Sequence, residues 1–248
     1  MSGELAGRTA LVTGAASGIG AAIAVAYAAA GARLCLADRA AGDGLAATAA
    51  RCGGDVVTVR ADVSDEADVE RMFATAAERL GHVDVLVNNA GILTEHHVIG
   101  MPTELFDQMI AVNLRSVFLC CRAALPGMVE RGFGRVINIA SQVGQKGGAG
   151  LSHYAAAKAG VVGLTKSLAR EVGKQGVTVN CIAPGPIVTP LGGDLSDEWT
   201  GPLLAGLPLG RFGQPEEVAP TAVLLASDPG GNIYTGQTLG PNSGDVML

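Results

Sequence analysis

The sequence predicts a doubly wound α/β fold, a seven-stranded, mainly parallel sheet with helices on both faces. Short runs of β-branched and aliphatic residues alternate with longer helical patterns almost from end to end, and strands separated by helices are joined by right-handed parallel crossovers. The 248 residues contain no linker, composition break or repeat of fixed period, so we expect one domain over 1–248. Because 48% of the residues are hydrophobic and only 16% are charged, a disordered chain is excluded.

The expected elements follow one another in a regular order. A buried run at 9–13 predicts the first strand, and a glycine-rich turn leads into a helix at about 18–30. An alanine-rich helix separates the second and third strands, and acidic residues begin the helix at 65–80. The strands are expected at 9–13, 33–37, 55–60, 83–87, 134–140, 177–183 and 238–239. Further helices are expected at 103–131, broken near Pro126, and at 152–172 and 216–226, with an irregular stretch at 184–214.

Composition excludes several classes of protein. The net charge of −6 repels phosphate backbones, so nucleic acid is not an expected partner. Five cysteines without metal-ligand spacing indicate reduced thiols in a cytoplasmic protein, with no catalytic metal. Residues 9–32 carry no charge, but glycines interrupt them, and we interpret them as strand, turn and helix rather than a membrane span.

A glycine-rich turn follows the first strand. Gly14, Gly18 and Gly20 have the spacing G-x-x-x-G-x-G and open a helix. Gly14 permits the turn, Gly18 lets backbone amides approach a pyrophosphate, and Gly20 lets the helix pack closely on the strand. Ser17 adds a hydroxyl donor. The turn predicts a dinucleotide site in a Rossmann-type sheet, although glycine needed for packing alone remains an alternative for this motif by itself.

Acidic residues at the ends of the next two strands favour NAD as the cofactor. Asp38 ends the second strand, where its carboxylate can accept both ribose hydroxyls of NAD and would repel the 2′-phosphate of NADP. Arg39 could neutralise that phosphate, so NADP remains possible. Asp62 and Val63, at the end of the third strand, could contact the adenine amine; the alternative is that Asp62 caps the next helix, a role that Ser64 or Asp65 fits better.

These features together resemble the short-chain dehydrogenase/reductase family. The matching pieces occur in the family's order and at its intervals along nearly the whole chain: Thr13-Gly14-x3-Gly18-Ile19-Gly20, Asn88-Asn89-Ala90-Gly91, Asn113, Ser141, Tyr154-x3-Lys158 and Pro184-Gly185. The resemblance implies an oxidoreductase that moves a hydride between a nicotinamide cofactor and a secondary alcohol/ketone pair.

The resemblance implies four catalytic residues. Tyr154 would exchange a proton with the substrate oxygen, and Lys158, one helical turn away, would lower the pKa of Tyr154 by favouring its phenolate. Ser141 would orient the substrate oxygen, and Asn113 would hold a helix kink and a proton-relay water. His153 is expected to face solvent or the rim of the substrate site, because neighbouring helix residues point about 100° apart.

The resemblance also implies the remaining contacts. Those to the cofactor come from Ile19, Asn89, Ala90, Gly91, Tyr154, Lys158, Pro184, Gly185, Ile187 and Thr189. Val143, Gln145 and Leu151 should line the substrate pocket, and about 184–214 should form a substrate loop or lid. Small residues on the helix at 152–172, beside an apolar helix around 117–125, imply a homotetramer or homodimer.

The substrate prediction rests on departures from one group within the family. Residues 153–180 are similar to NADPH-dependent 3-oxoacyl-[acyl-carrier-protein] reductases, but Asp38 favours NAD and Leu151 replaces the glutamine that they tend to carry. Few basic residues are available to dock an acidic carrier protein. We therefore predict NAD-linked oxidation of a small or medium, mainly uncharged secondary alcohol to a ketone, with that reductase as the alternative. A non-catalytic dinucleotide-binding regulator is a remote alternative, because such proteins typically lose the tyrosine or the lysine.

Overall fold

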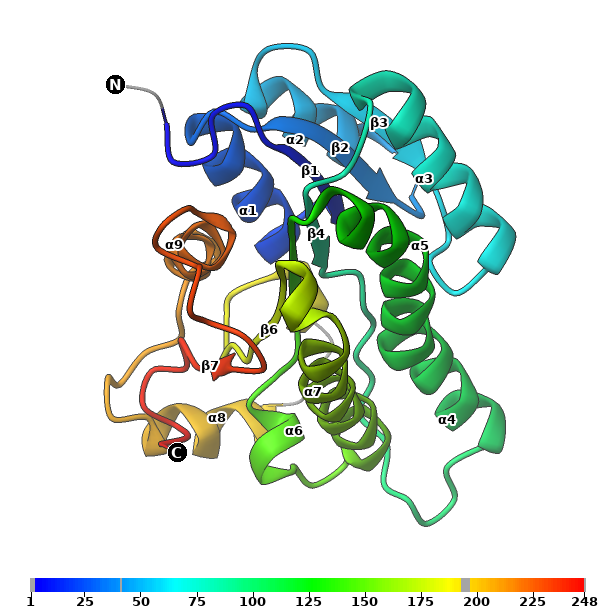
Figure 1. The fold of residues 1–248 in the computed structure, drawn as a ribbon. Helices are drawn as coiled ribbons and strands as arrows, with labels where there is room; N and C mark the ends of the chain where they lie inside the picture. Colours follow the sequence, from blue (N-terminus) through cyan, green and yellow to red (C-terminus); the bar gives the residue numbers. More distant parts are fainter. Residues whose placement is uncertain (1–2, 41, 193–196, 248) are drawn as a thin grey trace.

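The computed structural model describes residues 3–40, 42–192 and 197–247, and its sheet has seven strands in the order β3-β2-β1-β4-β5-β6-β7 (Figure 1). Every strand pair is parallel, which confirms the predicted doubly wound fold. The strands are β1 (Thr9–Thr13), β2 (Arg33–Asp38), β3 (Val57–Arg60), β4 (Val85–Asn88), β5 (Gly134–Ile139), β6 (Val177–Ile182) and β7 (Thr238–Leu239).

The two halves of the sheet meet where β1 lies beside β4. Leu11 of β1 is in register with Cys35 of β2 on one side and with Leu86 of β4 on the other. The chain therefore moves outward in opposite directions from this pair, and a crevice opens beyond the carboxyl ends of the strands. Every residue of β1, β4, β5 and β6 is buried, which explains their nearly continuous apolar sequences.

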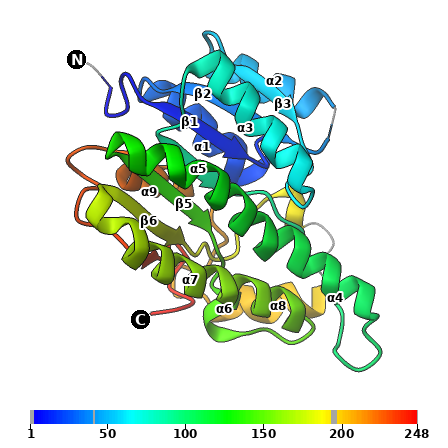
Figure 2. The same ribbon diagram turned by 45° about the vertical axis from the view of Figure 1, so that its right-hand side comes forward.

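Helices cover both faces of the sheet (Figures 1 and 2). On one face, α1 (Gly18–Ala29), α2 (Asp43–Cys52) and α9 (Pro215–Ala226) bury a core that includes Ile23 and Tyr27. On the other, α3 (Glu66–Leu80), α5 (Ser116–Arg131) and α7 (Ser152–Val172) bury a core that includes Met72 and Met128. The sheet is thus sealed from water on both sides, and its carboxyl edge is left for a site.

The long helix predicted at 103–131 is irregular, but not where the sequence suggested. It consists of α4 (Thr103–Ile110), a π-helical segment (Ala111–Arg115) and α5, and α5 continues through Pro126. The predicted break near Pro126 is therefore wrong. Because Pro126 has no N–H group, the carbonyl of Arg122 lacks its helical hydrogen-bond donor. Both residues lie on the exposed face of α5, where water can donate to that carbonyl instead.

The stretch predicted to be irregular at 184–214 contains regular structure. It includes a 3₁₀ turn (Pro190–Gly192) and α8 (Asp197–Gly206), and a parallel bridge between Ile187 and Gly213 joins its two ends. A further 3₁₀ turn (Gly173–Gln175) ends α7. A short helix that the sequence did not predict, α6 (Val143–Lys146), follows β5 and lies between the catalytic candidates Ser141 and Tyr154 in the chain.

The helix that α4, the π-helical segment and α5 form is long and apolar enough to cross a membrane by length and composition, with 29 residues and a mean hydropathy of 1.4 in its most apolar window. Its side chains Leu119, Leu125 and Met128 lie in the core between α5 and the sheet. Packing inside the protein therefore accounts for the apolar side chains on the face of α5 that meets the sheet.

The five cysteines are free thiols, and four of them are buried: Cys35, Cys120, Cys121 and Cys181. Burial raises the pKa of the Cys35 and Cys120 thiols to about 12. Cys52, at the end of α2, is half-buried; burial raises its pKa as well, and the neighbouring Arg51 partly offsets the rise. These thiols are therefore protonated at neutral pH.

Candidate active site

A cavity of about 530 Å³ lies at the carboxyl edge of the sheet. Its lining comes from the segments that follow the strands: Gly14, Ser17, Gly18, Ile19, Asp38, Asn89, Ala90, Gly91, Ile92, Leu93, Ile139, Ala140, Ser141, Gln142, Val143, Leu151, Tyr154, Lys158, Pro184, Gly185, Pro186, Ile187, Thr189, Pro190 and Leu191. Most of the site residues that the sequence predicts meet here. Six do not line the cavity: Gly20, Arg39, Asp62, Val63, Asn113 and Gln145.

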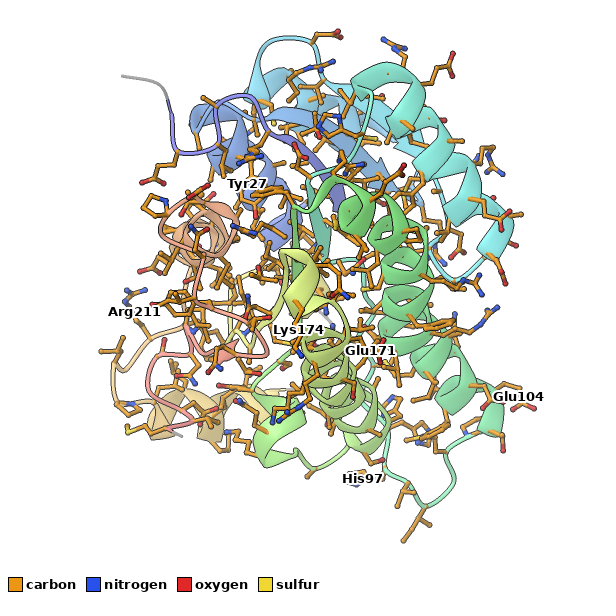
Figure 3. All side chains as sticks on the ribbon, in the orientation of Figure 1. Tyr27, His97, Glu104, Glu171, Lys174 and Arg211 are labelled. Carbon is orange, nitrogen blue, oxygen red and sulfur yellow. The ribbon has the colours of Figure 1, made fainter. Side chains whose placement is uncertain are left out.

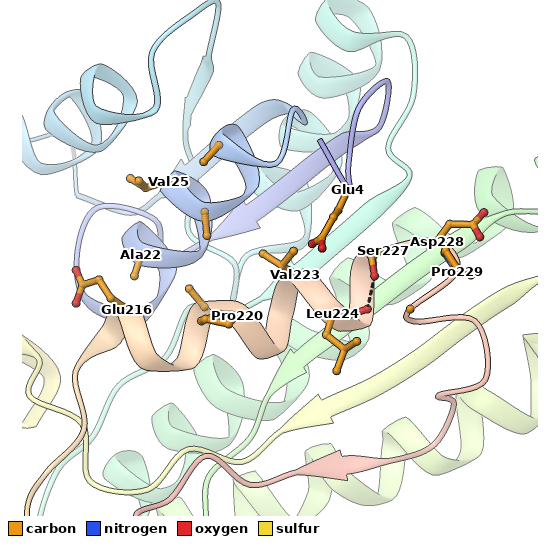
Figure 4. A pocket seen from close by; sticks show the side chains of 14 residues that line it. Glu4, Ala22, Val25, Glu216, Pro220, Val223, Leu224, Ser227, Asp228 and Pro229 are labelled. Atoms are coloured by element: carbon orange, nitrogen blue, oxygen red, sulfur yellow. Dashed lines mark hydrogen bonds between the residues drawn. The ribbon is translucent and has the colours of Figure 1, made fainter. Parts of the chain in front are cut away.

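A larger hollow, of about 760 Å³, lies between α1 and α9 (Figure 4). Its walls are mostly alanine and other apolar residues, with Glu4, Glu216 and Asp228 among them. None of the predicted site residues line it. The chemistry that the sequence predicts therefore belongs to the smaller cavity.

The glycine turn brings bare backbone to the cavity. Gly14 and Gly18 have positive φ angles of +65° and +54°. A Cβ on Gly14 would lie 2.7 Å from the Cα of Ala90, and a Cβ on Gly18 would lie 3.2 Å from Thr189. These positions leave no room for side chains, so the backbone itself forms the cavity wall. Gly20 serves packing, because a Cβ there would lie 2.2 Å from the Gly14 carbonyl oxygen.

The acidic residues after β2 and β3 have different surroundings. The Asp38 carboxylate lines the cavity and accepts hydrogen bonds from the backbone N–H groups of Ala16 and Ala40, each at 3.0 Å. The Asp62 carboxylate instead accepts from the N–H and hydroxyl of Ser64, and Asp65 caps α3. Arg39 is exposed outside the lining. Of these charged side chains, Asp38 alone belongs to a residue that lines the cavity.

Asparagine side chains join the turn after β1 to the segment after β4. The Asn89 amide donates to the carbonyls of Thr13 and Gly14, at 3.1 and 3.0 Å. Asn113, inside the π-helical segment, donates to the Ile92 carbonyl at 3.0 Å and accepts from the Ile92 N–H at 3.2 Å. Asn113 thus lies at the irregularity that the resemblance implied, and it fixes the segment that enters the cavity wall.

Tyr154, Lys158 and Ser141 converge at the inner end of the cavity. The Lys158 ammonium donates to the Ile139 carbonyl at 2.8 Å and lies 5.7 Å from the centroid of the Tyr154 ring. The Ser141 hydroxyl accepts from the Val143 N–H at 3.1 Å and forms a hydrogen bond with Tyr154. All three side chains are buried. This arrangement can hold an oxygen atom between a hydroxyl and a phenol.

Comparisons with known proteins agree with this geometry. A family model described as enoyl-(acyl carrier protein) reductase matches residues 14–244. The chain is 42% identical over 247 residues to the 3-oxoacyl-[acyl-carrier-protein] reductase of Synechocystis sp. (98% of this chain, 99% of the relative). It is 41% identical over 242 residues to the enzyme of that name from Escherichia coli (98% of each chain). A crystal structure of a short-chain type dehydrogenase/reductase from Mycobacterium marinum superposes with a TM-score of 0.93 and 36% identity (98% and 97% covered).

The chain belongs to the short-chain dehydrogenase/reductase family. A second solved member, levodione reductase, superposes with a TM-score of 0.91 at 37% identity, covering 97% of this chain and 98% of that one. The resemblance inferred from the motifs is confirmed. The chain is an oxidoreductase of this family, and the fold and the cavity described above are those of a family member.

Burial controls the charge state of Tyr154 and Lys158 in this short-chain dehydrogenase/reductase. Burial raises the pKa of Tyr154 to about 12, and the hydrogen bond with Ser141 offsets only part of the rise. The Lys158 ammonium is directed at the Ile139 carbonyl, and burial lowers the pKa of Lys158 to about 8. At neutral pH the phenol is therefore protonated and the lysine charged.

His153 was placed wrongly by the sequence. Its side chain is completely buried, and its Nε2 lies 2.8 Å from the Thr94 hydroxyl. Helical geometry predicted only that His153 points away from Tyr154, and the segment after β4 covers that direction. Across residues 3–40, 42–192 and 197–247, no group of three or more His, Cys, Asp and Glu side chains could hold a metal ion.

Proposed function

We propose that the chain reduces the 3-oxo group of an acyl thioester to a 3-hydroxyl group with NADH as the reductant. One observation carries the proposal: Tyr154, Ser141 and Lys158 line the same cavity, so a phenolic proton donor faces it beside a hydroxyl and an ammonium. Relatives with 41–42% identity along the whole chain are named 3-oxoacyl-[acyl-carrier-protein] reductases. That name favours reduction of this substrate class over the oxidation of a secondary alcohol that the sequence led us to predict.

The residues of the cavity account for the proton and the charge of this reaction. A bound NADH supplies the hydride that the carbonyl carbon receives. Tyr154 donates its phenolic proton to the carbonyl oxygen, and the ketone becomes a secondary alcohol. Ser141 donates a hydrogen bond to the same oxygen and fixes its position. The Lys158 charge favours the phenolate left on Tyr154, which regains a proton from water.

Asp38 is the reason for proposing NADH rather than NADPH. Its carboxylate already accepts two backbone N–H groups, and its remaining lone pairs can accept ribose hydroxyls. A 2′-phosphate would bring like charge to the same place. Gly14 and Gly18 line the same cavity, where we propose that their backbone meets the pyrophosphate, and Ile187 and Thr189 line it as well.

The apolar part of the cavity suits an uncharged acyl chain. Leu151 and Val143 line it and pack with Tyr154 and Met109 in a small hydrophobic cluster. Apolar surface of this kind attracts methylene groups and offers no partner to a charged substrate. Residues 184–187 and 189–191 line the cavity, and we propose that the segment at 184–214, of which residues 193–196 lie outside the described residues, acts as the substrate lid.

The proposal is tested by cofactor titration and by turnover of acetoacetyl-coenzyme A. Nicotinamide fluorescence should report tighter binding of NADH than of NADPH, and Asp38→Asn should narrow that preference about tenfold or more. Acetoacetyl-coenzyme A should be consumed together with NADH. Tyr154→Phe should abolish turnover and keep NADH binding, whereas Tyr234→Phe, a matched tyrosine outside the cavity lining, should leave both unchanged. No turnover by the unmodified protein, with NADH bound, would refute the thioester substrate.

NAD-linked oxidation of a secondary alcohol is the second candidate. Asp38 favours it, since NAD⁺ is the usual oxidant of catabolic dehydrogenases, and the cavity contacts would be the same. A screen of secondary alcohols with NAD⁺ separates the two. Turnover of a simple alcohol together with inert acetoacetyl-coenzyme A would put this candidate first.

We also propose that the chain assembles as a homodimer or homotetramer. Helices α5 and α7 contact each other, and Phe118 on α5 is 45% exposed, an apolar ring that a second copy could cover. Analytical ultracentrifugation tests the assembly, and a monomer at micromolar concentration would contradict it.

A further inference from the structure

The immediate neighbour of Tyr154 has an unusual environment for an ionisable side chain. His153 is 0% exposed, and its Nε2 is 2.8 Å from the Thr94 hydroxyl oxygen. Its other ring nitrogen, Nδ1, is also buried and has no hydrogen-bond partner. Burying a polar atom without a partner costs free energy. The hydrogen bond to Thr94 is therefore the interaction that can favour an imidazole at this buried position.

Thr94 belongs to the segment that forms one wall of the cavity. Ile92 and Leu93 line the cavity directly, and Thr94 follows them. Backbone contacts hold the same segment as well: Ile92 pairs with Asn113 at its start, and the His96 N–H donates to the Gly150 carbonyl at 2.8 Å. The first contact leads to the π-helical segment and the second to the loop before α7.

The bond between Thr94 and His153 is different, because it reaches the helix that carries Tyr154 itself. His153 lies in the first turn of α7, one residue before Tyr154. Beyond the contact between His96 and Gly150, the segment leads to a tip where Val98 and Ile99 are 72% and 90% exposed. His97, which precedes this tip, lies at the bottom of the view in Figure 3, and Glu104, at the start of α4, points outward there. The Thr94–His153 bond is therefore a polar anchor between the cavity wall and the catalytic helix, beside the apolar packing of Ile92 and Leu93 on the Tyr154 cluster.

We propose that His153 is a positioning residue, which through Thr94 holds the wall formed by Ile92 and Leu93 at a fixed distance from Tyr154. The inference rests on the proposed function, because it takes Tyr154 as the proton donor. The substrate lies between that wall and the phenol, so an unanchored wall would let the carbonyl move relative to its donor. Burial and the nearby His96 lower the pKa of His153, which keeps the imidazole neutral beside the Thr94 hydroxyl at neutral pH.

Substitutions at Thr94 test the bond without disturbing the core. Thr94→Val keeps the shape and removes the hydroxyl, whereas Thr94→Ser keeps the hydroxyl. Loss of one such bond should lower kcat/KM about fivefold to tenfold in Thr94→Val. KM for the thioester should rise and the dissociation constant of NADH should stay unchanged. Thr94→Ser should retain wild-type values, and the loss in His153→Leu should not add to that in Thr94→Val.

Hydrogen exchange of the backbone amides of residues 92–97 gives a readout that is independent of turnover. Thr94→Val should speed their exchange, and Thr94→Ser should not. Unchanged exchange in Thr94→Val, or faster exchange with an unchanged KM, would overturn the role of His153. If the unmodified protein reduces no thioester, the proposed function fails, and the exchange rates still decide whether His153 anchors the wall.

Discussion

Replacing Lys158 with methionine tests the electrostatics of the site quantitatively. Lys158 is 4% exposed, and burial lowers its pKa from 10.5 to about 8, a difference of about 2.5. At 1.36 kcal/mol for each pH unit, the charged ammonium destabilises the folded state by about 3 kcal/mol at pH 7. Methionine removes the charge at similar length and loses the hydrogen bond to the Ile139 carbonyl, which costs about 1 kcal/mol. We expect Lys158→Met to be more stable by about 2 kcal/mol and inactive.

The stability advantage of Lys158→Met should depend on pH. Between pH 8 and pH 10.5 the unfolded chain holds a proton on Lys158 that the folded chain has released, so the stability of the unmodified protein rises with pH. Below pH 8 both states are protonated and the full destabilisation is present; above pH 10.5 both are neutral and it is gone. The advantage of Lys158→Met is therefore largest at pH 7 and disappears towards pH 10.5.

Denaturant unfolding followed by circular dichroism, at several pH values over this range, measures the difference. Lys166→Met is the matched control, because Lys166 is an exposed lysine two turns further along α7, and its removal should change stability by less than about 0.5 kcal/mol. The reasoning is refuted if Lys158→Met is less stable than the unmodified protein at pH 7. An advantage that persists undiminished at pH 10.5 refutes it equally.

Further predictions concern buried contacts around the site. The Asn138 amide donates to the Thr165 hydroxyl at 2.8 Å, and Thr165→Val removes this acceptor. The free energy of unfolding, measured by denaturant titration, should fall by about 1–3 kcal/mol in Thr165→Val and by less in Thr165→Ser. Gly91→Ala places a Cβ 2.5 Å from the Asn113 side-chain oxygen, and should reduce kcat/KM at least about tenfold in a steady-state assay.

The sheet was predictable because its signals are local and repeated. Strands that are buried on both faces read as short apolar runs, and the predicted positions match β1 to β7 within about two residues. The helix at 197–206 was not predictable, because Gly201 and Pro202 inside it are strong signals of irregular structure. The long helix showed the opposite error: Pro126 suggested a break, but burial of the neighbouring residues Ala124 and Leu125 kept α5 intact.

The site was predictable as far as its motifs extend. Residues that approach the cavity through a strand end or a glycine turn, such as Asp38 and Gly14, were found from spacing. Asp62 and Asp38 both follow a strand, so their positions in the sequence did not show that only Asp38 lines the cavity. The Asp62 carboxylate is instead engaged by Ser64. The burial of His153 depends on a segment about sixty residues earlier in the chain, and no pattern around α7 reports it.

The positions of the cysteines allow local opening of the folded protein to be measured by thiol labelling. A thiol-reactive label added to the folded protein meets the half-buried Cys52 first. Labelling of Cys35 on β2, Cys121 on α5 and Cys181 on β6 has to wait until the surrounding structure opens, since all three are buried. Their separate labelling rates therefore measure the opening free energy of each half of the sheet, with no engineered probe. A dinucleotide that bridges the two halves should slow the three rates together.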